Sequence, residues 1–200
     1  MKPEASSVDK GPGAGRPRDP RIDAAILRAA AELVVEVGYS NLSLAAVAER
    51  AGTTKTALYR RWPSKAELVH EAAFAVPPSA VTAPPGDVAG DLRAMMAGAR
   101  DSFTNPVVRA ALPGLIADMA GNAELTARIM ERFAGLFEVM RYWVADSIGR
   151  GDARADVDPD RLVELIGGAT LLGMMLRPGE DLDGDWVERT ADIITHGVMV

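Results

Sequence analysis

The sequence predicts an all-α protein with an N-terminal helix-turn-helix head of three helices and a larger helical C-terminal body, about nine helices in all. Two observations lead to this fold class. Apolar residues recur three and four positions apart along almost the whole chain, as on the buried face of amphipathic helices. Glycine, proline and the capping residues Ser, Thr and Asp interrupt this pattern where one helix ends and the next begins.

The composition limits the protein to one compact unit or two small ones. The chain has 200 residues, of which 48% are hydrophobic and 25% charged, and it contains no cysteine. It therefore forms no disulfide framework and no thiolate metal site, and it suits a reducing compartment. Residues 1–20 lack the apolar core of a secretory signal, and no apolar run approaches the ~20 residues of a membrane span. We expect a cytoplasmic protein with no membrane partner.

The net charge of −6 is unevenly distributed along the chain. Residues 1–70 carry 11 Lys and Arg against 8 Asp and Glu, whereas residues 71–200 carry 11 Arg against 20 Asp and Glu. All four lysines lie in the first segment: Lys2, Lys10, Lys55 and Lys65. This asymmetry indicates a cationic head that faces phosphate, attached to an acidic body.

Residues 1–18 are rich in Pro, Gly and Ser, and we expect them to form a disordered basic arm. The arm serves as a solubilising leader or reaches phosphates or a minor groove, and the two roles are compatible. The first helix begins at the cap Asp19-Pro20 and ends at Gly38. Its apolar stripe covers the next two helices and consists of Ile22, Ala25, Ile26, Ala29, Ala30, Leu33, Val34 and Val37.

The stretch Ser43–Trp62 predicts two short helices joined by a tight turn. Ser43 and Thr54 are candidate N-caps, and Gly52 can adopt the left-handed backbone that turns the chain. The second helix has an inward side and an outward side. The inward side is Ala57, Leu58 and Trp62, and the outward side is Lys55, Thr56, Tyr59, Arg60 and Arg61. This small, polar, cationic side fits a recognition helix that enters a major groove; the alternative is a solvated surface helix.

From Gly38 to Leu68 the chain resembles the DNA-binding domain of the tetracycline-repressor (TetR) family of bacterial regulators. The resemblance rests on an ordered set of residues: Gly38-Tyr39, Ser43, Val47-Ala48, Ala51-Gly52, Leu58-Tyr59, Trp62, Ser64-Lys65 and Leu68. Thr53 stands where the family often has Val, and Trp62, followed by Pro63, stands where Phe is usual. Both departures could alter how the recognition helix sits.

The resemblance implies a DNA-binding domain at residues 19–66 and an effector-binding and dimerisation domain at residues 67–200. Thr54, Lys55 and Thr56 would approach the base edges of double-stranded operator DNA. The residues that would mainly hold phosphates, with base contacts from the arginines also open, are Ser43, Tyr59, Arg60, Arg61 and Lys65.

The fourth helix begins at a capping box, in which Ser64 caps and Glu67 reaches back. The resemblance implies that this helix carries ligand-driven movement from the body to the head. We expect its lone histidine, His70, to be a surface or packing residue. After a proline-rich loop, five amphipathic segments form the body, at residues 87–105, 106–120, 122–148, 158–176 and 183–196. Pro113 is expected to kink the second of them.

The segment 162–176 leaves little polar surface, and its three glycines let another helix approach closely. In the TetR family the last two helices pair with their copies in a four-helix dimer interface, which requires such an apolar helix. The alternative is that this helix is the centre of a monomer's core.

The body is rich in methionine and aromatic side chains, which suit ordinary core packing and also a pocket for an apolar small molecule. The resemblance implies an effector pocket between the middle helices. The residues that we expect to line it are Met96, Phe103, Met119, Phe137 and Met140.

The sequence has no nucleophile elbow, phosphate loop or metal-binding helix motif, and we predict no enzyme activity, no cofactor and no metal. The acidic runs 156–160 and 181–185 depart from a calcium loop at its glycine position, and we expect them at helix starts. The leading hypothesis is a nucleoid-associated, homodimeric repressor released from operator DNA by a small apolar effector. The alternatives are an activator of the same family, or a helical ligand-binding protein or enzyme with a non-functional DNA head.

Overall fold

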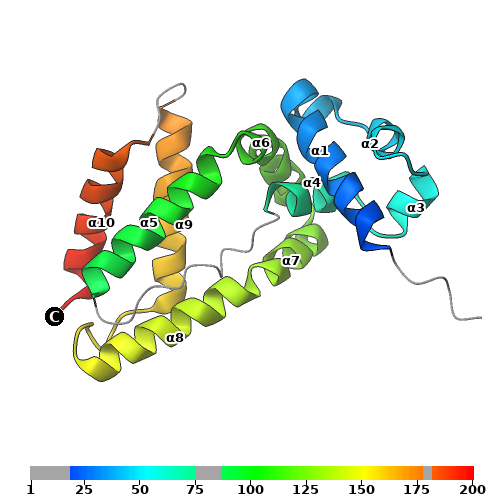
Figure 1. Ribbon diagram of the computed structural model, residues 1–200. Coiled ribbons are helices and arrows are strands. Elements are labelled where there is room, and N and C mark those ends of the chain that lie inside the picture. The colour runs from blue at the N-terminus through cyan, green and yellow to red at the C-terminus, as the bar shows by residue number, and fades with distance from the viewer. Residues whose placement is uncertain (1–18, 75–86, 178–181) are drawn as a thin grey trace, which may run out of the picture.

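The computed structural model describes residues 19–74, 87–177 and 182–200, which fold into ten α-helices and no named strand (Figure 1). In chain order the helices are α1 (Pro20–Asn41), α2 (Leu44–Arg50), α3 (Lys55–Tyr59), α4 (Lys65–Ala73), α5 (Val88–Thr104), α6 (Pro106–Ala120), α7 (Ala123–Arg132), α8 (Ala134–Arg150), α9 (Pro159–Leu176) and α10 (Gly184–Val198). The all-α fold class is confirmed. The expected arm at residues 1–18 and loop at residues 76–86 lie outside the described residues.

The predicted helix starts are confirmed by side-chain caps. Oxygens of six residues accept hydrogen bonds from amides of the first helical turn: Asp19, Ser43, Thr54, Ser64, Asp158 and Asp183. The last two place the acidic runs at helix starts, as expected. Gly38 has a φ of 78° and breaks α1 at the predicted position, and Gly52 has a φ of 63° between α2 and α3. L-residues with a side chain rarely adopt such backbone angles.

The core of the head forms beneath α1. The predicted stripe of α1 is buried along its middle turns, at Ile26, Ala29, Ala30, Leu33 and Val34. Two members of that stripe differ from the expectation: Ile22 is 37% exposed and Val37 is 42% exposed. Both lie at ends of the regular helix, where the periodic pattern continues beyond the packed core.

The segment 122–148 was expected as one helix, and the structure corrects this to two, α7 and α8. The chain breaks at Phe133, whose amide donates to the Met130 carbonyl at 2.9 Å in a tight turn. Apolar residues continue at helical spacing through the break, and neither glycine nor proline marks Phe133. The sequence pattern therefore cannot reveal it. Helix α6, in contrast, continues as one helix through Pro113.

Figure 1 shows the head, α1 to α3, at one end of the molecule and α5, α8, α9 and α10 at the other. Helix α5 packs against α9 and α10, and its Asp91 accepts a hydrogen bond from the Trp143 indole of α8 at 2.8 Å. Helix α1 of the head and the following helix α4 pack on α6, and α4 also contacts α7. Within the described residues, no helix is both long enough and apolar enough to cross a membrane.

Candidate DNA-binding head and effector cavity

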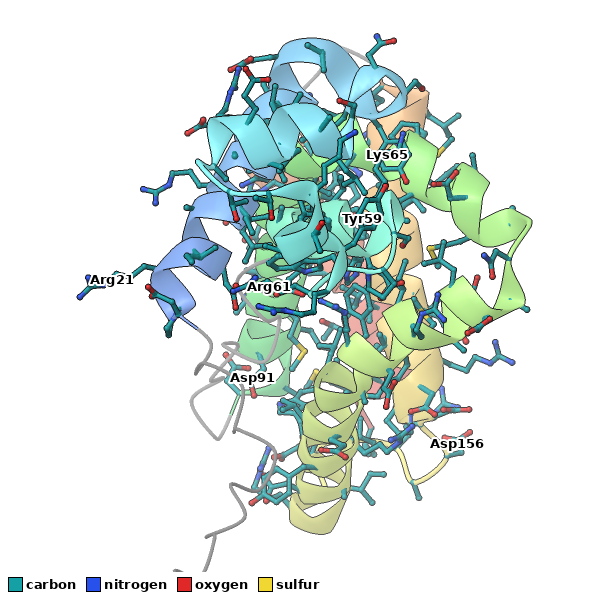
Figure 2. The ribbon with its side chains drawn as sticks, turned by 90° about the vertical axis from the view of Figure 1, so that its right-hand side faces the viewer. Arg21, Tyr59, Arg61, Lys65, Asp91 and Asp156 are labelled. Carbon is teal, nitrogen blue, oxygen red and sulfur yellow. The ribbon has the colours of Figure 1, made fainter. Side chains whose placement is uncertain are left out.

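Helix α3 presents a polar face to solvent on a firmly anchored base. The Thr54 hydroxyl accepts from the Ala57 amide at 3.2 Å and fixes the start of the helix. Leu58 and the following Trp62 are 0% and 3% exposed, and they hold the helix against the core. The exposed residues of this face are Thr54, Lys55, Thr56, Tyr59 and Arg60. Tyr59 is 51% exposed, and Figure 2 shows it on the head.

Arg61 differs from the other residues predicted for DNA contact. Its side chain is only 7% exposed, and its guanidinium forms an ion pair with Asp23 of α1. The same side chain donates to the carbonyl of Ala57 at 3.0 Å. In this conformation Arg61 connects the end of α3 to α1. It would have to leave Asp23 to reach a phosphate.

Ser43 and Lys65 lie at the starts of α2 and α4. The Ser43 hydroxyl is exposed and caps the Ala46 amide at 3.2 Å. The Lys65 ammonium donates to the Tyr39 carbonyl at 3.0 Å and lies 4.3 Å from the centroid of the Tyr39 ring. Lys65 therefore supports the backbone after α1 as well as bringing positive charge to the start of α4.

Tyr39 joins the head to the body. Its hydroxyl donates to the Asp118 carboxylate of α6, and its ring lies directly against the backbone of Gly114. Burial, followed by the bond to Asp118, raises the pKa of Tyr39 well above its usual value, so the hydroxyl stays protonated. Sequence reasoning missed this contact. The only local signal was a glycine inside a helix, which often marks a close approach.

Two ion pairs join α4 to α7. The Glu67 carboxylate accepts a hydrogen bond from the Ser64 hydroxyl at the start of α4. It also lies 3.2 Å from the Arg128 guanidinium of α7. One turn later, Glu71 pairs with Arg132 and also accepts from the Trp62 indole at 2.9 Å. The Glu71 carboxylate thus contacts both Arg132 of the body and Trp62, which anchors the recognition helix.

A cavity of about 660 Å³ lies inside the body, among α4, α5, α8 and α9. This volume falls in the range of about 300–1,000 Å³ that small-molecule sites occupy. The described lining includes aromatic residues, aliphatic residues and methionines. Its polar members are Ser102 and Asn105, and none of the described lining residues is charged. Such a wall suits an apolar, uncharged molecule.

Two family models match the chain. One, described as the N-terminal segment of bacterial regulatory proteins of the tetR family, matches residues 26–72. The other, the Tetracyclin repressor-like C-terminal domain, matches residues 83–194, which is more than half of the chain. This chain belongs to the TetR family. It is a transcriptional regulator with a DNA-binding helix-turn-helix domain.

Similar proteins agree with this assignment. A DNA-binding transcriptional repressor TetR of Mycobacteroides abscessus is 29% identical over 187 residues, covering 84% of this chain and 89% of the relative. An uncharacterised HTH-type transcriptional regulator of Mycobacterium bovis is 28% identical over 184 residues, covering 90% and 87%. A putative TetR-family regulator of Mesorhizobium loti superposes with a TM-score of 0.69 at 18% identity, covering 92% of this chain and 100% of that structure.

The cavity of this TetR-family regulator contains some of the predicted effector residues and not others. Phe103, Phe137 and Met140 line it. Met96 is fully buried near α9, where its sulfur lies 3.7 Å from the Thr170 hydroxyl, and Met119 packs on the core of the head. Sequence reasoning missed two lining aromatics, Phe74 at the end of α4 and Phe133 at the α7–α8 break. For Phe74 the available signal was its place just before the proline-rich segment at residues 76–86, whereas nothing in the sequence pattern marked Phe133.

Proposed function

We propose that this regulator is a homodimeric repressor that a small, apolar effector releases from operator DNA. It acts at the nucleoid, and its role is regulation rather than catalysis. Residues 19–66 form the DNA-binding domain, residues 67–200 form the effector and dimerisation domain, and residues 1–18 form a basic arm. The observation that carries this proposal is that Phe74, which ends α4, the helix that directly follows the head, also lines the body cavity.

In the proposed complex the exposed face of α3 enters a major groove. Thr54, Lys55 and Thr56 approach base edges, because they occupy the slim, polar N-terminal part of the recognition helix. Tyr59, Arg60, Ser43 and Lys65 hold phosphates on either side. Arg61 contributes by fixing α3 through Asp23, and it contacts DNA only when that ion pair opens.

The dimer forms through α9 and α10. In the single chain α9 buries Leu162, Ile166 and Thr170 but leaves a row of large apolar residues in solvent. The exposed residues on these two helices are Leu165, Leu172, Met175, Leu176 and Ile193, which are 55% to 74% exposed. Contiguous apolar surface of this kind is typical of a protein interface. Pairing would bring two recognition helices to a spacing of ~34 Å, one turn of duplex DNA.

The effector acts through a difference in affinity between two states. A ligand that fits the cavity better when the heads are splayed shifts the population toward that state, and DNA is released. Since Phe74 belongs to both the cavity wall and α4, a change in the cavity moves the end of α4 directly.

The experiment is DNA binding measured by fluorescence anisotropy, using duplexes from the protein's own promoter region at several salt concentrations. Tyr59→Ala is expected to weaken binding about tenfold, because each subunit no longer holds a phosphate with this hydroxyl. Arg60→Ala should also make the plot of the logarithm of the binding constant against the logarithm of the salt concentration less steep. The slope should fall by about one for each phosphate that loses its neutralising cation.

The matched controls are Tyr142→Ala and Arg141→Ala, because both side chains are exposed on α8, outside the proposed DNA face and the proposed dimer helices. They should bind DNA like the wild type. Equal affinity for the α3 variants and these controls would count against the proposed DNA face. In vitro transcription from the same promoter separates a repressor from an activator.

A further inference from the structure

His70 is a buried polar side chain that no other side chain or backbone group in the described part of the chain hydrogen-bonds. It lies on α4 and is 4% exposed, and neither Nδ1 nor Nε2 has a hydrogen-bond partner among the described residues. A neutral imidazole carries one donor and one acceptor, and buried polar groups of this kind are nearly always paired. Of the two histidines in the chain, the other, His196, is exposed on α10 and contacts Asp192. The unpaired state of His70 therefore calls for a physical explanation.

Two aromatic rings that line the cavity pack against His70. Its ring centroid lies 5.0 Å from that of Phe74 and 5.3 Å from that of Phe133, and both phenylalanines line the cavity. Phe74 also lies 5.6 Å from Phe133 and 6.5 Å from Phe103. We call Phe74, Phe103 and Phe133 the aromatic wall.

The aromatic wall stands at helix boundaries rather than in helix interiors. Phe74 is the C-cap of α4, with φ −112° and ψ 43°, and Phe133 is the residue between α7 and α8. Both rings are half-buried. Access from the cavity to His70 would require one of these two rings to rotate about its side-chain bonds.

The polar side chains of the described cavity lining lie close together in the chain. The α5 residues that line it are, in order, Met95, Gly98, Ala99, Ser102 and Phe103. Ser102 thus directly precedes Phe103 of the aromatic wall, and Asn105 follows at the start of α6. The remaining lining includes Met95, Met140, Val163 and Ile166, which are all apolar. The two polar lining side chains thus come from the C-terminal end of α5 and the residue after it, beside Phe103.

We propose that the cavity binds an uncharged amphipathic molecule, with an apolar body and one terminal hydroxyl or similar group, and that His70 is the hydrogen-bond partner of that group. A ligand hydroxyl can donate to the unprotonated nitrogen of a neutral imidazole or accept from the protonated one, so it would pair one of the two ring nitrogens. An anionic group fits poorly, since the nearest cations, Arg128 and Arg132, are already paired with Glu67 and Glu71. Because the cavity is a ligand site only under the proposed function, this assignment rests on it.

The test uses three probes of equal chain length: 1-decanol, 1-fluorodecane and decanoate. Their affinities are measured by displacement of Nile red from the full-length protein. We expect 1-decanol to bind about tenfold more tightly than 1-fluorodecane, as for one buried hydrogen bond. Decanoate should be the weakest of the three. His70→Leu should reduce the preference for the alcohol to less than twofold, whereas His70→Gln, which keeps a donor and an acceptor, should retain part of it.

A second readout needs no variant of His70. In protein with ¹⁵N-labelled histidine, 1-decanol should shift the ring nitrogen signals of His70 and leave those of His196 in place, and His196→Gln assigns the two sets. Equal affinity for alcohol and fluoride, or unmoved His70 signals while 1-decanol displaces Nile red, would overturn the role of His70 and leave the cavity as an effector site. If none of the probes, Nile red included, binds while DNA binding is intact, both the effector cavity and this assignment are overturned.

Discussion

The contact between Gly114 and Tyr39 gives the sharpest test of how the head is seated on the body. A Cβ atom at position 114 would lie 2.1 Å from Cδ1, 2.5 Å from Cγ and 2.8 Å from Cε1 of the Tyr39 ring. The ring cannot retreat easily. It is 6% exposed, its hydroxyl is bound to Asp118, and the Lys65 ammonium lies over its face.

The size of the effect follows from two opposing terms. Adding a methyl group to a packed contact costs about 1–3 kcal/mol. Alanine inside a helix is favoured over glycine by up to about 1 kcal/mol. We therefore expect Gly114→Ala to lower the free energy of unfolding by about 1–2 kcal/mol. For a domain of this size that corresponds to a melting temperature lower by about 2–8 °C.

Urea unfolding followed by circular dichroism measures this difference. The control is Gly149→Ala on α8, since a Cβ there meets nothing within 4 Å, and its stability should equal or slightly exceed that of the wild type. In a Tyr39→Ala background the cost of Gly114→Ala should vanish, because the ring is gone. If Gly114→Ala is as stable as Gly149→Ala, the close packing of α6 on Tyr39 is refuted.

Three further outcomes follow from other parts of the molecule. Burial and Arg132 lower the pKa of His70 from 6.5 to about 4, so its contribution to stability is intact above pH 6.5 and is lost as the pH falls toward 4. The free energy of unfolding, measured with urea, should be about 2–3 kcal/mol lower at pH 4.5 than at neutral pH, and His70→Leu should remove this difference. An equal pH dependence in the variant would contradict the assignment to His70. Glu71→Ala should destabilise by about 1–2 kcal/mol because the buried Trp62 indole is left without its acceptor, whereas the exposed Glu131→Ala should be neutral. Leu172→Glu should convert the proposed dimer to monomer in sedimentation velocity, while Ile116→Glu on α6 should not, and a dimer that survives the first change would exclude this face.

The sequence predicted those features that depend on neighbours along the chain. Each cap at Ser43, Thr54 and Ser64 bonds to an amide three residues later, so the spacing alone indicates it. The left-handed turn at Gly52 is equally local. The helix-turn-helix could therefore be located from the sequence, with its buried and exposed sides. The all-α fold class follows from the same periodicity.

Features that depend on distant residues could not be predicted. Helical spacing predicts Arg61 on the outward side, but the structure buries its side chain in an ion pair with Asp23, which depends on how α1 crosses α3. The break at Phe133 lies within an uninterrupted apolar pattern. Met119 is a flexible apolar residue of the kind that lines pockets, yet its place on α6 packs it against the core of the head. The pattern gives the face of a helix, whereas the partner of that face is decided by tertiary packing.

The contacts of α4 suggest why a small molecule could control the head. The Glu71–Arg132 pair is 36% and 37% exposed, and partly exposed ion pairs contribute roughly 1 kcal/mol or less. The ion pairs to α7 therefore add little to the hold on α4, whose Leu68 and Val69 are fully buried in the core. The packing of Tyr39 on Gly114 fixes the end of α1 to α6. A ligand that displaces Phe74 or Phe133 would act on the C-terminal end of α4 and on its contact with α7. Shifting a two-state equilibrium from 1:99 to 99:1 requires a difference in binding free energy of about 5.5 kcal/mol. Burial of an apolar ligand in a cavity of 660 Å³ supplies free energy of that order when the two states fit it unequally.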